Sequence, residues 1–352
     1  MAMTKFSGRS LKAFVCLAAL FPWTAAQATP ILVVDTASHE VLYQEDAGAP
    51  WYPASTTKLM TALITFQALR SGEVTLKTPV VMTRNATRQA FLESGLTFGR
   101  TMTLEDALYG ALVASANDVA VAIAEKVGGD LPTFIRRMNA EAQRLGMTGT
   151  HFASPNGLFD KDNYTTARDL AILGMEIEKQ FPQYRQFFAP SAVTFDGKEV
   201  KSNNQLLTRY AGTIGMKTGF LCASGRNYVG LAERNGRQVM VVMLGATTER
   251  ERNERAAQYL DEAFGGRLPS MGRVETIANR ADISAPDMRV KLCTPASAAY
   301  ETERNAMYPM GLPGHESFLK DEIPGITHAI STWATENVAD VPLPKPRPQE
   351  FQ

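Results

Sequence analysis

The stretch "YPASTTKLMTALI", Tyr52 to Ile64, places a serine three residues before a lysine at the start of an apolar run. Residues three apart on a helix lie on the same face, so we expect Ser55 and Lys58 to be in contact. The apolar residues that follow indicate a helix packed in the core. A lysine in this place is either a surface group whose ammonium reaches solvent or a buried amine that accepts a proton. The rest of the chain decides between these interpretations.

The first 28 residues have the pattern of a secretory signal peptide. Three basic residues precede the apolar run "AFVCLAALF", which leads to the small residues of "AQA". This order predicts cleavage after Ala28, and the apolar run is too short for a permanent membrane span. An uncleaved N-terminal anchor is the alternative. We therefore expect an exported, periplasmic protein whose mature chain begins at Thr29.

Charge and cysteine content narrow the class of protein further. The full chain has 36 basic and 36 acidic side chains; residues 1–28 hold three basic and no acidic ones, which leaves 33 against 36, a net charge of −3. This balance gives no reason to expect nucleic acid as a partner. Cys222 and Cys293 remain in the mature chain, where a disulfide between them is one option. No Cys-x-x-Cys or His-x-x-x-His spacing indicates a metal site.

Turn and capping signals divide the mature chain into a main domain at 29–266 and an extension at 267–352. "ILVVDTASHEVLYQE" predicts two strands about a turn, and Asn235-Gly236 predicts a hairpin between two more. Between them, Thr103 and Thr166 are predicted helix N-caps, and Gly146 is predicted to end another helix. Strands at both ends with helices between predict an α/β (α+β) fold in which an antiparallel sheet is flanked by helices.

The extension differs in composition from the main domain. Prolines recur, helical periodicity is poor, and the chain ends in "VPLPKPRPQEFQ", which predicts an extended, Pro-rich tail. Ile326, Ile330 and Trp333 have the i, i+4, i+7 spacing of an apolar helix face. We expect this face to pack on the body of the protein, since a helix on a membrane surface carries more Lys and Arg.

Two further short motifs follow the first in a meaningful order. Ser55-x-x-Lys58 is followed by Ser115-x-Asn117 within "ASAND" and by Lys217-Thr218-Gly219 within "GMKTGF". Each motif alone is weak, because each also fits an ordinary helix start, turn or strand end. Together they occur at a predicted helix start, a turn between helices and a strand before a turn. This ordered trio is found in penicillin-binding proteins and class A β-lactamases.

With these motifs the chain resembles the D-alanyl-D-alanine carboxypeptidase family, the low-molecular-mass penicillin-binding proteins. The likeness extends to "HFASPNGLFDKDNYTTARDLAIL", "NNQLL" and "KTGF...GLAERNGRQVMVVMLGA", and it covers most of Ile31 to Phe264. It implies a β-lactamase/transpeptidase-like fold that needs no cofactor. The extension does not resemble the β-rich second domain and terminal amphipathic anchor of many relatives. Attachment to the inner membrane, at most peripheral, is therefore left open.

The three motifs supply a nucleophile and a base. A serine hydroxyl needs a base within hydrogen-bond reach, and none of the motifs contains a histidine. Lys58 can act as this base if burial and a neighbouring cation, for which Lys217 is the candidate, leave its amine neutral. A helix that begins at Ser55 also directs backbone N–H groups at developing negative charge. The chemistry favours a buried Lys58.

The resemblance implies roles for the second motif. Ser115 would complete the catalytic group with Ser55 and Lys58 by relaying a proton between Lys58 or Lys217 and the leaving amine. Asn117 would hydrogen-bond the peptide carbonyl of the substrate and hold Lys58 in place.

The resemblance also implies roles for the third motif. Lys217 and Thr218 would receive the terminal carboxylate of the substrate. Gly219 would let the substrate approach the strand edge, where a side chain would obstruct it. The backbone N–H groups of Ser55 and Phe220 would form the oxyanion hole, since main-chain donors are fixed before charge develops.

The activity that the resemblance implies is that of a serine-type D-Ala-D-Ala carboxypeptidase. It would remove the terminal D-alanine of peptidoglycan stem pentapeptides through an acyl-enzyme on Ser55, and penicillins and other β-lactams would inhibit it. A DD-endopeptidase, a β-lactamase and a catalytically silent peptidoglycan-binding protein are the alternatives. The intact nucleophile and base argue against the last. Class A β-lactamases deacylate through a water held by glutamate, and their Glu-x-x-Leu-Asn pattern does not occur between Asn117 and Lys217.

Overall fold

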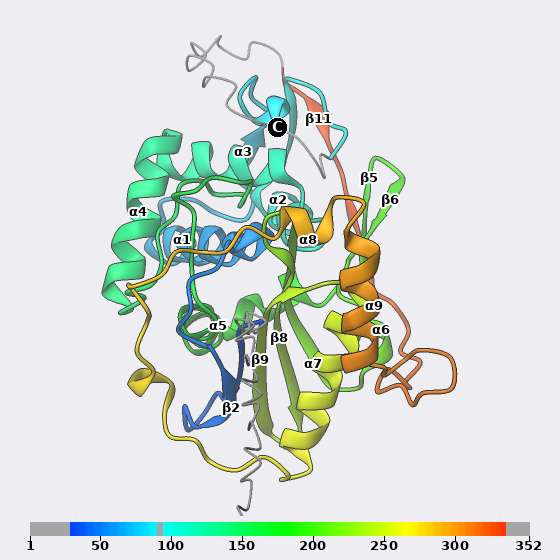
Figure 1. Cartoon of the computed structure of the whole chain (residues 1–352). Coiled ribbons are helices and arrows are strands. Elements are labelled where there is room, and N and C mark those ends of the chain that lie inside the picture. Colours follow the sequence, from blue (N-terminus) through cyan, green and yellow to red (C-terminus); the bar gives the residue numbers. More distant parts are fainter. Residues whose placement is uncertain (1–28, 90–93, 336–352) are drawn as a thin grey trace, which may run out of the picture.

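A five-stranded antiparallel sheet forms the centre of the molecule (Figure 1). The computed structural model describes residues 29–89 and 94–335. The strands lie in the order β2-β1-β9-β8-β7, and each neighbouring pair is antiparallel. This places β7 at one edge of the sheet. The strands are β1 (Ile31–Asp35), β2 (Val41–Glu45), β7 (Thr213–Leu221), β8 (Gly225–Arg234) and β9 (Arg237–Ala246).

Both faces of this sheet are covered by helices. Successive side chains of a strand point to opposite faces. On β9, the side chains of Val239 and Val241 pack on the α7 face, and those of Met240 and Val242 pack on the α5 face. A strand buried on both faces needs a continuous apolar run, and "VMVVML" supplies it. The two helices are α5 (Ala167–Gln180) and α7 (Glu249–Phe264).

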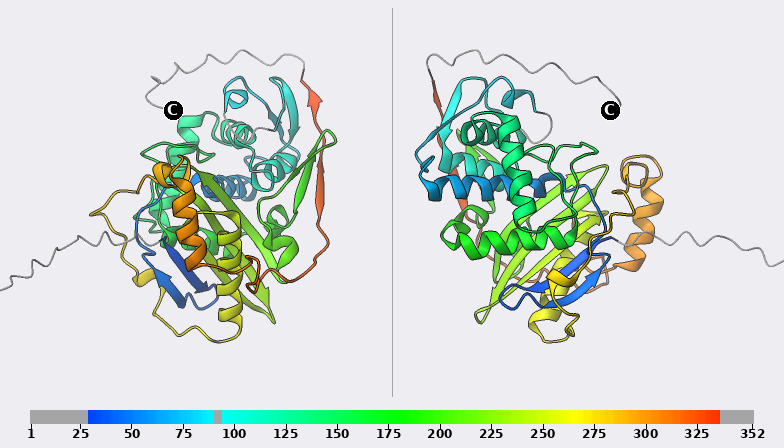
Figure 2. Two further views of the ribbon diagram at one scale, coloured as in Figure 1. Left: turned by 45° about the vertical axis from the view of Figure 1, so that its right-hand side comes forward. Right: turned by 90° about the vertical axis from the view of Figure 1, so that its left-hand side faces the viewer.

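Further helices lie beside the sheet, and the right-hand view of Figure 2 shows them on the left, away from the orange helix α9 (Ser297–Met307) on the right. The N-caps of α2 and α5 are those expected from the sequence, because Thr103 Oγ1 accepts the Asp106 N–H at 3.0 Å and Thr166 Oγ1 accepts the Asp169 N–H at 3.1 Å. The chain turns after α4 at Gly146, whose φ is 68°. The helices are α1 (Lys58–Ser71), α2 (Leu104–Leu112), α3 (Asn117–Gly128) and α4 (Leu131–Arg144).

The remaining elements lie around these helices and the central sheet. Two small sheets have the strand orders β10-β5-β6 and β11-β4-β3. The strands are β3 (Pro79–Val81), β4 (Arg100–Thr103), β5 (Ala192–Phe195), β6 (Lys198–Lys201), β10 (Thr327–Ile330) and β11 (Trp333–Ala334). The helices are η1 (Ala54–Thr57), η2 (Ala86–Arg88), η3 (Pro182–Phe188), α6 (Leu206–Arg209), η4 (Val274–Thr276), α8 (Arg289–Leu292) and α9 (Ser297–Met307).

The predicted helix face of Ile326, Ile330 and Trp333 is wrong, because this segment forms strands. β10 pairs in parallel with β5, and β11 pairs with β4. Ile330 is buried, as the expected packing on the body requires, whereas Ile326 and Trp333 are exposed. The i, i+4, i+7 spacing could not reveal this, since the strands that pair with the segment lie far earlier in the chain. The predicted signal peptide and the Pro-rich end fall outside the described residues.

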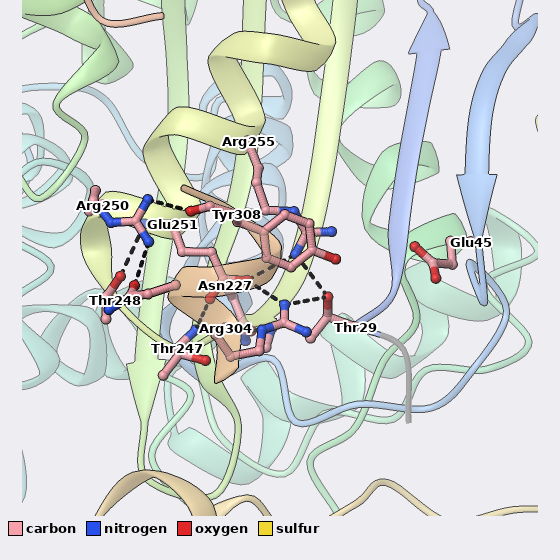
Figure 3. Close-up of polar contacts among 12 residues, drawn as sticks. Thr29, Glu45, Asn227, Thr247, Thr248, Arg250, Glu251, Arg255, Arg304 and Tyr308 are labelled. Atoms are coloured by element: carbon pink, nitrogen blue, oxygen red, sulfur yellow. Dashed lines mark hydrogen bonds and ion pairs between the residues drawn. The ribbon is translucent and has the colours of Figure 1, made fainter. Parts of the chain in front are cut away.

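The described part of the extension is joined to the main domain by a disulfide and by buried charges. Cys222 and Cys293 form the disulfide that the sequence left as an option. Figure 3 shows Glu251 of α7 between Arg255 and Arg304, the latter from α9. Arg255 Nη1 lies 3.0 Å from Glu251 Oε1, and all three side chains are buried. Arg304 therefore ties the extension to the helix that covers the sheet.

Replacing Arg304 by methionine should lower the free energy of unfolding by about 3 kcal/mol, because it removes one partner of a buried carboxylate. Urea unfolding monitored by circular dichroism measures the change. Lys320→Met is the matched control, since Lys320 pairs with Glu316 on the surface, and it should leave the unfolding midpoint unchanged. Equal midpoints for Arg304→Met and wild type would show that the ion pair does not hold the extension in place.

Candidate active site

Ser55 and Lys58 meet where η1 runs into α1. Lys58 Nζ lies 2.9 Å from Ser55 Oγ, which confirms the expected contact. The lysine side chain is fully buried, and its Nζ also lies 2.7 Å from Asn117 Oδ1 and 2.8 Å from the carbonyl oxygen of Asn156. A neutral amine has two N–H groups and one lone pair. With the N–H groups donated to these two amide carbonyls, the lone pair is directed at the Ser55 hydroxyl.

The electrostatic environment favours the neutral form of Lys58. Burial holds the pKa of Lys58 well below its usual range, and the nearby Lys217 ammonium lowers that pKa further, while Asp118 acts in the opposite direction. Burial is the larger cause because an ammonium loses its hydration there. The carboxylate of Asp118 accepts hydrogen bonds from the Ser94 N–H and hydroxyl, both at 2.8 Å, so it braces the neighbouring loop.

Ser115 and Lys217 form a second pair across the site. Ser115 lies in the turn between α2 and α3 with a φ of 61°, a value that non-glycine residues rarely adopt. Lys217 Nζ on β7 lies 2.9 Å from Ser115 Oγ and 3.0 Å from the carbonyl oxygen of Thr218. Burial, with a smaller contribution from Arg252, lowers the pKa of Lys217 to about 7. Its amine can therefore gain or lose a proton near neutral pH.

The edge strand β7 lies directly against the serine. A Cβ atom added at Gly219 would lie 2.8 Å from Ser55 N and 3.0 Å from the carbonyl oxygen of Pro53. The sequence predicted glycine here to let the substrate approach. The geometry shows an additional and stricter need, because a side chain would collide with the backbone of the nucleophile itself. The side chain of Phe220, the next residue, is half exposed and stacks under the Arg226 guanidinium.

Residues outside the three motifs also support the site. The carbonyl of Asn156 holds Lys58, and Gly157 after it needs a positive φ of 84°. Asn227, fully buried on β8, donates to the carbonyl oxygens of Tyr52 and Pro53, both at 2.9 Å, and so fixes the loop before Ser55. The sequence predicted neither contact, because a backbone carbonyl has no signature in side-chain type and Asn227 carried no signal. In the described ranges, no three His, Cys, Asp or Glu side chains are grouped to hold a metal.

Ser55, the buried Lys58 amine and the edge strand β7 meet at one site. The fold that brings them together is of the β-lactamase/transpeptidase-like class. Crystal structures similar to this chain include penicillin-binding protein 5 from Haemophilus influenzae, at TM-score 0.63 and 27% identity over 67% of this chain and 70% of that chain. Penicillin-binding protein D2 from Listeria monocytogenes, in a cefotaxime-bound form, gives TM-score 0.62 and 29% identity over 67% of this chain and 96% of that one.

Sequence comparison identifies the family. A profile described as D-alanyl-D-alanine carboxypeptidase matches residues 19–248. The chain therefore belongs to the D-alanyl-D-alanine carboxypeptidase family, as the resemblance predicted. D-alanyl-D-alanine carboxypeptidase DacF of Bacillus subtilis is 30% identical over 68% of this chain and 63% of its own length. DacA of Haemophilus influenzae is 32% identical over 60% of this chain and 56% of its own. The matched part thus spans about 60% of these relatives.

Proposed function

We propose that this chain is a serine-type D-Ala-D-Ala carboxypeptidase that acts on peptidoglycan stem pentapeptides. The observation that carries the proposal is the buried Lys58 amine, 2.9 Å from Ser55 Oγ and held on its other side by two amide carbonyls. Ser55 Oγ attacks the carbonyl carbon of the penultimate D-alanine while its proton passes to Lys58. The backbone N–H groups of Ser55 and Phe220 stabilise the oxyanion that forms.

Collapse of this intermediate breaks the peptide bond and releases D-alanine. The leaving nitrogen takes the proton that Lys58 accepted from Ser55, relayed through Ser115, whose hydroxyl is hydrogen-bonded to Lys217. Lys217 and Thr218 hold the terminal carboxylate. Asn117 holds Lys58 through Oδ1, and an amide nitrogen such as its Nδ2 would donate to a substrate carbonyl, as the family resemblance implies. Water then hydrolyses the ester on Ser55 and restores the serine.

The protonation states of the two lysines predict a bell-shaped pH dependence of kcat/KM. Lys58 must be neutral to accept the serine proton, so the rate should rise as the pH increases through its lowered pKa. Lys217 must be charged to bind a carboxylate, and with a pKa of about 7 its hold on the substrate should weaken above that pH. Lys217→Arg should remove this decline, because an arginine stays charged. An unchanged decline in that variant would contradict the role given to Lys217.

A methyl group at Gly219 should lower the rate of penicillin acylation about 100-fold, because it displaces the Ser55 N–H that stabilises the oxyanion. Stopped-flow measurement with a fluorescent penicillin gives this rate. Gly265→Ala at the end of α7, where φ is −75°, is the control and should acylate like wild type. Wild-type acylation by Gly219→Ala would show that the close approach of β7 to Ser55 is unimportant for the reaction.

Digestion of purified muropeptides tests the proposed substrate. A carboxypeptidase removes one alanine from pentapeptide monomers and leaves cross-linked dimers intact, and mass spectrometry distinguishes these products. Conversion of dimers into monomers would instead identify the endopeptidase. If neither substrate changes, the protein is the catalytically silent binding protein.

The lifetime of the penicillin adduct separates the carboxypeptidase from a β-lactamase. We expect a long-lived adduct on Ser55, because the β-lactamase glutamate pattern is missing between Asn117 and Lys217. The adduct lifetime should be compared with D-alanine release from a diacetyl-Lys-D-Ala-D-Ala peptide. Fast multiple turnover of penicillin without D-alanine release would favour the β-lactamase.

We further propose that the enzyme works outside the cytoplasm, in the periplasm, as the signal pattern of residues 1–28 predicts. The disulfide supports an oxidising compartment. In the described part of the chain, no helix is both long and apolar enough to cross a membrane. Fractionation of cells into periplasm, membrane and cytoplasm, followed by penicillin labelling, tests the location.

A further inference from the structure

The extension is fixed at the C-terminal end of β7, beyond Gly219. β7 ends at Leu221, and Cys222, the next residue, is bonded to Cys293. The Met288 N–H also donates to the carbonyl oxygen of Ala223 at 3.0 Å, and the Met288 side chain is buried. These contacts place α8, which begins at Arg289, beside the last residues of the strand.

A side chain of this segment contacts Phe159, which packs on Tyr52, and we call these two aromatic residues the rim of the site. The Arg289 guanidinium carbon lies 4.2 Å from the centre of the Phe159 ring, and this ring packs edge to face on Tyr52 at 5.2 Å. Tyr52 is three residues before Ser55. Burial raises the pKa of Tyr52, and the Asp287 carboxylate raises it further, whereas the Arg289 guanidinium lowers it. The extension thus supplies a charged pair to the rim.

The direction of the substrate along β7 follows from the proposed function, on which this inference rests. The terminal carboxylate is held at Lys217 and Thr218, and the reacting carbonyl lies at Phe220. The part of the peptide that stays on the enzyme must therefore continue toward Leu221 and Cys222. At about 3.3 Å per residue, the residue that precedes the two D-alanines reaches the end of the strand. This is where the disulfide fixes α8.

We propose that the segment Asp287–Cys293 forms a wall of the substrate cleft, and that Arg289 and Asp287 bind a zwitterionic side chain on the residue preceding D-Ala-D-Ala. This segment lies beyond the stretch that the family profile matches, which ends at residue 248. Specificity for this part of the peptide is then supplied by the extension of this chain.

The chemistry of the pair determines the ligand. Arg289 Nε lies 3.2 Å from Asp287 Oδ2, and the Arg289 backbone N–H donates to Asp287 Oδ1 at 3.0 Å. A guanidinium has four further N–H donors for a carboxylate. The aspartate remains an acceptor for an ammonium group beside that carboxylate. Because the pair has no net charge, a ligand side chain that bears both charges matches it better than one with an ammonium alone.

Three peptides that differ only in the residue before D-Ala-D-Ala test whether the segment Asp287–Cys293 selects this side chain. This residue is a diamino dicarboxylic acid with a zwitterionic end, lysine, or acetyl-lysine. For wild type, kcat/KM for D-alanine release should be highest with the zwitterionic peptide. Arg289→Ala should lower that value about tenfold or more and bring it to the level of the lysine peptide. Its kcat/KM for acetyl-lysine and its penicillin acylation rate should stay within about twofold of wild type.

A matched variant and a weaker substitution serve as controls. Arg280 pairs with Asp282, two residues away on the same extension, so Arg280→Ala removes a similar pair and should keep the wild-type preference. Arg289→Lys keeps the positive charge but lacks the paired N–H donors of a guanidinium, so it should retain part of the preference for the zwitterionic peptide. The double variant Cys222→Ser/Cys293→Ser should also weaken this preference, because without the disulfide the wall is no longer fixed to β7.

The outcomes separate this inference from the proposed function. If Arg289→Ala discriminates among the three peptides as wild type does, or if wild type does not prefer the zwitterionic peptide, the wall is refuted while the carboxypeptidase activity stands. If wild type releases D-alanine from none of the peptides, the proposed function fails, and this inference fails with it. Loss of penicillin acylation by Arg289→Ala would mean that the residue supports the site as a whole, which also contradicts a role limited to substrate choice.

Discussion

Replacing Ser55 by alanine should reduce D-alanine release from pentapeptides to the background of the assay. The hydroxyl is the proposed point of covalent attachment, and the variant leaves the reaction without a nucleophile, since removing the nucleophile of such a unit costs orders of magnitude in kcat. The fold should remain, because only one oxygen is lost from a small buried side chain. Release of D-alanine is measured with a coupled oxidase assay, and thermal unfolding confirms the fold.

Ser38→Ala is the matched control for this experiment. Ser38 lies in the turn after β1, where its hydroxyl contacts Asp35 at 3.1 Å, and it should have no role in the reaction. The variant should release D-alanine like wild type. Turnover that survives Ser55→Ala but not Ser38→Ala would exclude Ser55 as the nucleophile.

Replacing Lys58 by alanine should slow acylation at least about a thousandfold, because it removes the only amine within hydrogen-bond distance of Ser55 among the contacts described above. The acylation rate with a fluorescent penicillin measures the loss. Lys58→Arg separates two explanations, since arginine keeps a positive charge but cannot act as a base. If Lys58 is the base, both variants are slow.

A fast Lys58→Arg variant would show that a cation beside Ser55 is sufficient, and that the serine proton goes elsewhere. A near wild-type rate for Lys58→Ala would contradict the role of base outright. In either case Lys217, whose pKa is about 7, would become the next candidate.

The elements of the fold that depend on short-range signals could be predicted from the sequence. The hairpin at Asn235-Gly236 joins β8 to β9, with both turn residues at positive φ. The caps Thr103 and Thr166 and the stop at Gly146 act within one helical turn of their partners, so a local pattern contains all the necessary information.

The path of the extension could not be predicted in this way. β10 and β11 exist because they pair with β5 and β4, and no residue within the segment specifies those remote partners. An apolar spacing of three and four residues therefore suggested a helix where the hydrogen bonds form a strand.

The candidate site shows the same division between local and remote information. The contact of Ser55 with Lys58 follows from helix geometry, and it is present. The carbonyl of Asn156 and the buried Asn227 support the site through backbone and remote contacts that have no signature in side-chain type. The need for Gly219 was predicted with only part of its reason, because the approach of β7 to Ser55 is visible only in three dimensions.

Mapping the penicillin adduct on the wild-type protein tests whether Ser55 is the nucleophile. Cleavage after lysine and arginine places Ser55 on the peptide that ends at Lys58 and Ser115 on a different one that ends at Lys126, so the mass of the modified peptide distinguishes them. Fragmentation then separates Ser55 from Ser38 on the first peptide. We expect one penicilloyl group, on Ser55. An adduct on Ser115 or another residue, or no adduct at saturating penicillin, would contradict it.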